Sequence, residues 1–113
     1  MHELTLSESI VNLVVECARI EQLRAVTRVV LEIGTAAGVE IEALRFCFDL
    51  VTKDTLAQGA VLAIDVVSLQ ARCRSCAANF IPDHAVSACP QCGSYAIELV
   101  CGRELRVKSI DGE

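Results

Sequence analysis

The sequence has few aromatic residues, no excess of positive charge and no long apolar run. Phe, Tyr and Trp make up only 4% of its 113 residues, so the core must be built mainly from Val, Leu, Ile and Ala, within a hydrophobic fraction of 53%. The formal net charge is −5. An acidic chain lacks the basic surface that binds nucleic acid or anionic membranes without specificity.

Two further absences concern targeting and catalysis. Charged residues interrupt every apolar stretch well before the roughly 18 residues of a membrane-spanning helix, and Glu3 and Glu8 replace a basic signal-peptide start. We therefore expect a cytoplasmic protein.

The sequence also lacks catalytic motifs. No phosphate loop, nucleophile motif or carboxylate–histidine pairing is present. The expectation is a protein that is not an enzyme.

The apolar periodicity predicts an α+β fold. Helical spacing covers residues 5–22 and 40–53, whereas alternation typical of strands covers residues 27–35, 58–71 and 102–110. This order predicts two helices on one face of a three-stranded mixed sheet, with an inserted zinc-ribbon-like domain. The expected domains are residues 1–70 with 102–113, and an insert of residues 71–101.

The same periodicity predicts the core. In the first strand, Val29, Leu31 and Ile33 should point inward. The predicted apolar stripes of the two helices are Ile10, Leu13, Val14 and Cys17 in the first, and Ile41, Leu44, Cys47, Phe48 and Val51 in the second.

The insert contains two C-x-x-C pairs, Cys73 with Cys76 and Cys89 with Cys92, and twelve residues separate the pairs. Four thiolates suit tetrahedral Zn²⁺, and a site filled by four protein ligands leaves no position for substrate. Between the pairs only Phe80, Ile81 and Val86 are sizeable apolar residues. The metal must therefore contribute much of the folding energy, which predicts a structural zinc site.

Other interpretations of the cysteines remain open. An iron site of the rubredoxin or iron–sulfur kind uses the same ligand pattern, and one C-x-x-C alone could serve a thiol oxidoreductase. Cys17 and Cys47 lie on apolar helical faces, where a free thiol behaves as a small hydrophobe. His84, in the loop between the pairs, is expected at the surface or beside the site rather than as a ligand.

The chain begins Met-His-Glu. The amine of Met1, the amide nitrogen of His2 and a ring nitrogen of His2 can close a five-membered and a six-membered chelate ring on one metal ion. Nitrogen donors in a plane suit Ni²⁺ or Cu²⁺. Glu3 could add its carboxylate or its amide. The alternative is a frayed terminus with no function.

Several stretches together resemble the HypA/HybF family of nickel-insertion accessory proteins for [NiFe]-hydrogenase maturation. They are MHELTLSESIV, LEIGTAAGVEIEALRFCFDLVTKDT, the C-x-x-C pair with CPQCGS, and GRELRVKSID. The resemblance covers the whole chain and implies a nickel metallochaperone. It implies transient Ni²⁺ at Met1, His2 and Glu3, and structural Zn²⁺ at the four predicted cysteines, Cys73, Cys76, Cys89 and Cys92.

The resemblance also implies partners, namely a HypB-type nickel GTPase and the [NiFe]-hydrogenase large-subunit precursor, with the chain itself a monomer or a weak homodimer. Relatives that serve urease often carry histidines beside the zinc cysteines. Here the neighbours are Arg72, Arg74, Ala77, Ala88 and Gly93, which favours hydrogenase alone. The alternative function is a zinc-ribbon adaptor that handles no transferable nickel.

Overall fold

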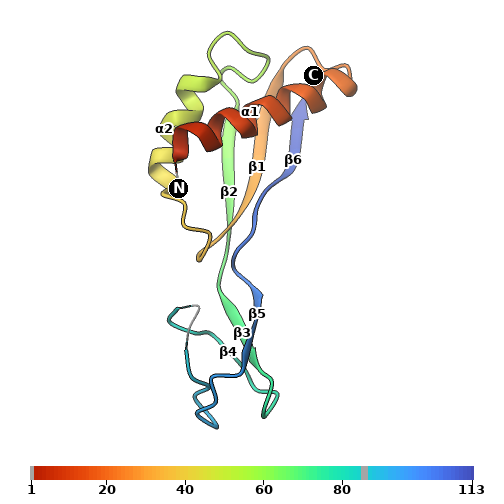
Figure 1. Cartoon of the computed structure of the whole chain (residues 1–113). Coiled ribbons are helices and arrows are strands. Elements are labelled where there is room, and N and C mark those ends of the chain that lie inside the picture. The colour runs from red at the N-terminus through yellow and green to blue at the C-terminus, as the bar shows by residue number, and fades with distance from the viewer. Residues whose placement is uncertain (1, 85–86) are drawn as a thin grey trace. The chain divides into compact units, whose positions relative to one another are not determined.

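The computed structural model describes residues 2–84 and 87–113, and Met1 and Val86 of the expectations above lie outside them. Two helices alternate with strands, and the insert adds three short strands (Figure 1). The elements are α1 (Glu3–Ile20), β1 (Val26–Gly34), α2 (Ile41–Val51), β2 (Val61–Val67), β3 (Gln70–Cys73), β4 (Asn79–Phe80), β5 (Ile97–Cys101) and β6 (Leu105–Gly112).

The three long strands form one sheet in the order β2-β1-β6. Backbone hydrogen bonds run from Val26 N to Leu56 O just before β2, and from Thr35 N to Val67 O at its end. Both strands therefore run in the same direction, which makes this pair parallel.

The pair of β1 and β6 runs the other way. Ala25 N donates to Glu113 O, whereas Gly34 N donates to Glu104 O, so the start of β1 lies beside the end of β6. The sheet is mixed, and both helices lie on one of its faces (Figure 1). The predicted α+β architecture is confirmed.

The core lies between this sheet and the helices. Val29, Leu31 and Ile33 are at most 2% exposed, as their alternation predicts, and Leu44 and Phe48 of α2 are equally buried. These are aliphatic side chains with one aromatic ring, in keeping with the composition.

The predicted stripe of α1 is partly wrong. Leu13 is 51% exposed, whereas Ser7 and Ala18 are fully buried. Ser7 tolerates burial because its hydroxyl donates to Leu44 O of α2 at 3.5 Å. The side of α1 that is buried is therefore the side that faces α2, whether or not its residues are hydrophobic.

The chain divides into two compact units. The first consists of residues up to Leu31 together with Gly38–Asp65 and Arg106–Glu113, and contains both helices. The second consists of Glu32–Ala37 and Val66–Leu105, and contains a second sheet in the order β4-β3-β5 with antiparallel pairs.

Three segments of the second unit meet at a point that we call the glycine clasp, formed by Gly34, Leu69 and Gly102. A Cβ on Gly34 would lie 2.0 Å from the carbonyl carbon of Gly102, and a Cβ on Gly102 would lie 2.4 Å from Leu69 Cα. Ala36 N donates to Gly102 O at 2.8 Å, and Leu69 N donates to the Thr35 hydroxyl at 3.0 Å. Only glycine allows backbones this close.

Within residues 2–84 and 87–113, neither helix combines the length and the apolar composition that a bilayer-crossing helix requires.

Candidate metal centre

The four predicted cysteines come together in the second unit. Their sulfur atoms all lie within 4.8 Å of one another, and two of the separations are 3.5 Å (Cys73 to Cys92) and 3.6 Å (Cys76 to Cys89). A disulfide needs about 2.05 Å, so the sulfurs are not bonded to each other. A tetrahedron of sulfurs about 2.3 Å from a zinc ion has edges of about 3.8 Å. The cluster therefore fits a structural metal ion such as zinc.

Each C-x-x-C pair is held by the same two backbone hydrogen bonds. In the first loop, Ala77 N donates to Cys73 O at 2.9 Å and Cys73 N donates to Ala78 O at 2.9 Å. In the second loop, Gly93 N donates to Cys89 O and Cys89 N donates to Ser94 O, both at 2.8 Å. The two loops are thus built alike, and together they present two pairs of thiols to one point.

The first cysteine of each pair is buried and the second is exposed. Strand β3 ends at Cys73, so the first loop starts at the end of the central strand of the second sheet. Arg74 N donates to Ala96 O at 2.8 Å, so the first loop is tied to the chain that leads into β5.

Two serines join the loops, and sequence reasoning did not find them. The Ser75 hydroxyl donates to the Ser94 hydroxyl at 3.1 Å, and Ser94 also accepts a hydrogen bond from Ala96 N at 3.0 Å. The only signal in the sequence is their position, because Ser75 lies inside the first C-x-x-C and Ser94 two residues after the second. Their bridge helps to hold the two thiol pairs at a fixed separation.

Hydrogen bonding divides the thiols by acidity. The backbone N–H of Cys76, with a smaller contribution from Ser75, lowers the pKa of Cys73 to about 6. In the same way the N–H of Cys92, and then that of Gln91, lowers the pKa of Cys89. Charge-assisted hydrogen bonds of this kind stabilise a thiolate.

The second thiol of each pair behaves in the opposite way. The N–H of Ser94 lowers the pKa of Cys92, but the neighbouring Cys73 thiol and burial outweigh it and raise the pKa to about 12. For Cys76 the N–H of Ala78 is likewise outweighed, by burial and by Cys89 and Cys73, so its pKa is raised. Four thiolates this close repel one another unless a cation lies between them, so the donor set suits a divalent metal.

Of the predicted nickel residues, His2 and Glu3 are described by the structure and lie in the first unit. His2 is the exposed N-cap residue of α1, and its side chain makes no capping hydrogen bond. The Glu3 carboxylate accepts a hydrogen bond from Glu40 N, the N-cap residue of α2, at 3.2 Å, and this hydrogen bond lowers the pKa of Glu3. His84 lies in the second unit, as an exposed residue.

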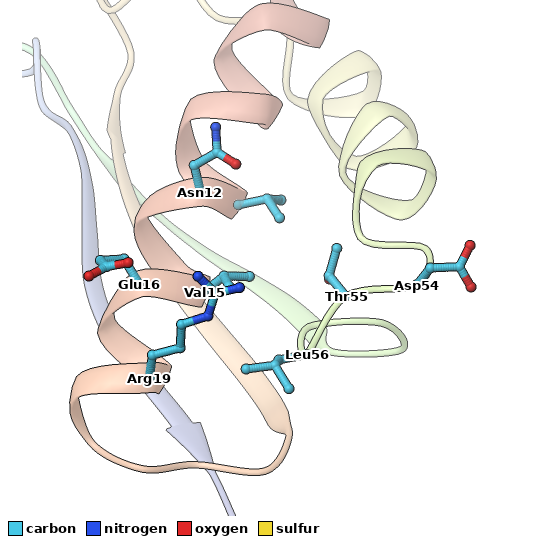
Figure 2. A pocket seen from close by; sticks show the side chains of 8 residues that line it. Asn12, Val15, Glu16, Arg19, Asp54, Thr55 and Leu56 are labelled. Atoms are coloured by element: carbon cyan, nitrogen blue, oxygen red, sulfur yellow. The ribbon is translucent and has the colours of Figure 1, made fainter.

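A cleft of about 740 Å³ lies elsewhere in the first unit, between α1 and the segment that follows α2 (Figure 2). Its apolar lining includes Val15 and Leu56, and Glu16, Arg19 and Asp54 line it with charges of both signs. None of the predicted metal residues lines it.

The fold and the cluster define a small α+β metal protein with a four-thiol centre of structural type, and comparison with known proteins identifies it further. The family model for "Hydrogenase/urease nickel incorporation, metallochaperone, hypA" matches residues 1–112. The hydrogenase maturation factor HypA of Albidiferax ferrireducens is 43% identical over 113 residues, and the alignment covers all of both chains. The hydrogenase maturation factor HybF of Klebsiella pneumoniae is 46% identical over 114 residues, again with full coverage of both.

A solved structure agrees. The solution structure of the Ni metallochaperone HypA from Helicobacter pylori matches with a TM-score of 0.70 and 25% identity, over 99% of this chain and 97% of that one. The chain belongs to the HypA family. It is accordingly a metallochaperone of hydrogenase maturation rather than an enzyme.

Proposed function

We propose that this metallochaperone binds Ni²⁺ at its N-terminus and delivers it to the large subunit of a [NiFe]-hydrogenase. The observation that carries the proposal is the position of His2, whose exposed imidazole at the N-cap of α1 makes no capping hydrogen bond. An imidazole in that position is available to a metal ion, beside the amine and amide nitrogens of the terminus.

Glu3 has a different part in this proposal. Its carboxylate already accepts a hydrogen bond from Glu40 N, so it holds the start of α1 against the start of α2. One oxygen of the Glu3 carboxylate is engaged with Glu40 N and the other has no such hydrogen bond, so Glu3 can add a ligand to the core set of His2 with the terminal nitrogens.

The zinc assignment rests on the cluster. Cys73, Cys76, Cys89 and Cys92 form the structural site, and four protein ligands leave no open position for a transferred ion. The proposed division into a nickel domain, residues 1–70 with 102–113, and a zinc domain, residues 71–101, has support in the placement of His2 and the four cysteines in different compact units.

The proposed partners are a HypB-type nickel GTPase as nickel source and the hydrogenase large-subunit precursor as recipient, with this chain as a monomer or a weak homodimer. Because no imidazole lies next to the zinc cysteines in the sequence, we propose service to hydrogenase rather than urease. A cluster of four free thiols needs a reducing compartment, which favours the cytoplasm.

Nickel titration by calorimetry tests the proposal, with zinc measured on the same samples. The His2→Ala variant should lose nickel binding and keep one zinc per chain, whereas His84→Ala, which removes the other histidine, should keep both metals. A variant with one residue added before Met1 should also lose nickel, because the amine moves away from His2. Undiminished tight nickel binding in His2→Ala would refute the assignment, and a chain that binds zinc alone would favour a zinc-ribbon adaptor.

A further inference from the structure

The outer side of α2 carries a large apolar surface. Phe46 is 67% exposed, and Leu50, one helical turn later, is 46% exposed. Side chains four residues apart are neighbours on a helix, so these two form one patch rather than scattered contacts with water. The chain contains only three phenylalanines, and this one is left outside the core. Exposed aromatic rings within an apolar patch are typical of surfaces that bind another protein.

Carboxylates flank this patch on one side. Glu42 lies four residues before Phe46 and Asp49 three residues after it, so both adjoin the ring on the helix surface. Both are exposed, and neither forms an ion pair with any residue that the structure describes. At about 100° per residue, both carboxylates fall on one side of Phe46 and Leu50 falls on the other. The outer side of α2 is therefore acidic along one flank and apolar along the other.

The cations of this region leave the two carboxylates without partners. The Arg45 guanidinium donates to Leu62 O of β2 at 2.6 Å, so it is engaged at the sheet. Lys53 lies beyond the end of α2, and within the described part of the chain it forms no ion pair.

Helix stability explains only one of the two carboxylates. Glu42 stands in the first turn of α2, where the helix dipole favours a negative charge. Asp49 stands in the last turn, where the dipole disfavours a negative charge and where no basic residue compensates. The position of Asp49 costs α2 stability, which is typical of a residue whose role lies in binding.

We propose that the outer side of α2 docks a basic amphipathic helix of a partner protein. Apolar side chains of that helix, three or four residues apart, pack on Phe46 and Leu50, which have the same one-turn spacing. An arginine beside them contacts the Phe46 ring and pairs with Glu42 and Asp49. This surface serves partner recognition, and it does not depend on the proposed nickel site.

A second copy of this chain fits the surface poorly. Two α2 helices packed antiparallel would bring acidic flank against acidic flank, with Glu42 of one copy near Asp49 of the other, and like charges repel. In a parallel pair, the acidic flank of one helix would meet the apolar flank of the other. The carboxylates would then lose water without gaining a partner, which is unfavourable. A basic helix avoids both costs, so charge complementarity selects it.

Peptide titration followed by nuclear magnetic resonance tests the proposal on the full zinc-loaded chain. The probe is an alanine-based helical peptide with two leucines one turn apart and two arginines beside them. It should shift the amide signals of residues 42–50, and it should bind roughly tenfold more tightly than the same peptide with glutamates in place of the arginines. Phe46→Ser should abolish this binding, whereas Ile20→Ser on α1, which truncates a side chain of 70% exposure, should leave it unchanged.

Neutral variants separate charge recognition from apolar contact. Glu42→Gln combined with Asp49→Asn should remove the preference for the arginine peptide. Glu8→Gln combined with Glu16→Gln changes two exposed carboxylates of α1 and should keep that preference.

Three results would overturn the proposal. The first is equal binding of both peptides by the unaltered chain, and the second is signal shifts confined to residues outside α2. The third is a concentration-dependent dimer that Phe46→Ser abolishes, because the occupant would then be a second copy. His2→Ala should bind the arginine peptide as the unaltered chain does, so a failure of the nickel assignment is distinguishable from a failure of this one.

Discussion

Ala77 and Gly93 hold the same left-handed backbone conformation, with φ of 64° and 74°. Each follows the second cysteine of its pair, and each N–H donates to the carbonyl of the first cysteine. The metal centre thus imposes one backbone geometry at two places, and the sequence supplies glycine at only one of them. The other position carries strain that a methyl group causes.

Exchanging the residues at these two positions should change stability in opposite directions. Ala77→Gly should stabilise the zinc-loaded chain by up to about 1 kcal/mol, because relief of strain exceeds the added freedom of the unfolded chain. Gly93→Ala should destabilise it by about 1 kcal/mol through backbone strain alone, since a Cβ at Gly93 would meet nothing within 4 Å. Chemical denaturation measures both. Stabilisation by both variants would contradict the shared geometry.

Zinc binding should weaken steeply as the pH falls. Cys92, with its pKa raised to about 12, and Cys76, with its pKa raised above 9.0, hold protons at neutral pH and must release them to bind metal. Cys73, with a pKa near 6, is already a thiolate there. At least two protons therefore leave when zinc binds. A fall in pH from 8 to 7 should lower the apparent association constant for zinc roughly 100-fold. Competition with a chromophoric chelator measures this slope, and a tenfold change would argue against two protonated thiols.

Loss of one zinc ligand should affect the second unit and spare the helices. Cys89→Ser removes a buried member of the cluster, whereas α1 and α2 both belong to the first unit. Far-ultraviolet circular dichroism should therefore retain its helical signal while zinc content falls. Cys101→Ser is the matched control, because Cys101 lies in the same unit outside the cluster and should leave zinc bound. Complete loss of helix in Cys89→Ser would show that the units do not fold separately.

The glycine clasp should not tolerate a side chain. Gly34→Ala places a methyl group against the Gly102 backbone, which cannot move as a flexible side chain can, so we expect a loss of about 3 kcal/mol or failure to fold. Gly38→Ala and Gly59→Ala are the controls, since a Cβ at either site meets open space. Those two should cost only about 1 kcal/mol each, from their positive φ. Thermal unfolding ranks the three variants, and equal losses would contradict a close approach at Gly34.

The Glu3 carboxylate should stabilise the first unit in a pH-dependent way. Its pKa is lowered below 4.5 by the hydrogen bond from Glu40 N, so the stabilisation is present above pH 4.5 and is lost as the pH falls through the folded-state pKa. Glu3→Gln should therefore lower the melting temperature near pH 7 and have no effect in strong acid. Glu8→Gln, which changes an exposed glutamate five residues further along α1, serves as the control. A constant difference at all pH values would mean that the hydrogen bond does not select the charged form.

Local patterns predicted the elements and the cluster well. Alternation identified Val29, Leu31 and Ile33, because residues two apart in a strand share a face. The spacing of the four cysteines predicted that their sulfur atoms lie close together, since each C-x-x-C loop is a local structure that presents two thiols side by side. Both are short-range relationships, which a sequence displays directly.

Long-range relationships were not predicted. The burial of Ser7 and the exposure of Leu13 depend on where α2 lies, and α2 is more than 30 residues away in the sequence. The clasp of Gly34, Leu69 and Gly102 joins three distant segments, and nothing local marks these glycines as different from Gly38 or Gly59. The antiparallel placement of β6 beside β1 likewise follows only from the assembled sheet.

His2 occupies the N-cap of an 18-residue helix. Helix dipoles leave a partial positive charge at this end, which repels cations and attracts anions. An ion such as Ni²⁺ held by His2 would be bound less tightly than by the same donors on an unfolded peptide. The fold would then lower the free energy required to release the ion, because the helix dipole opposes the binding of a cation at this end.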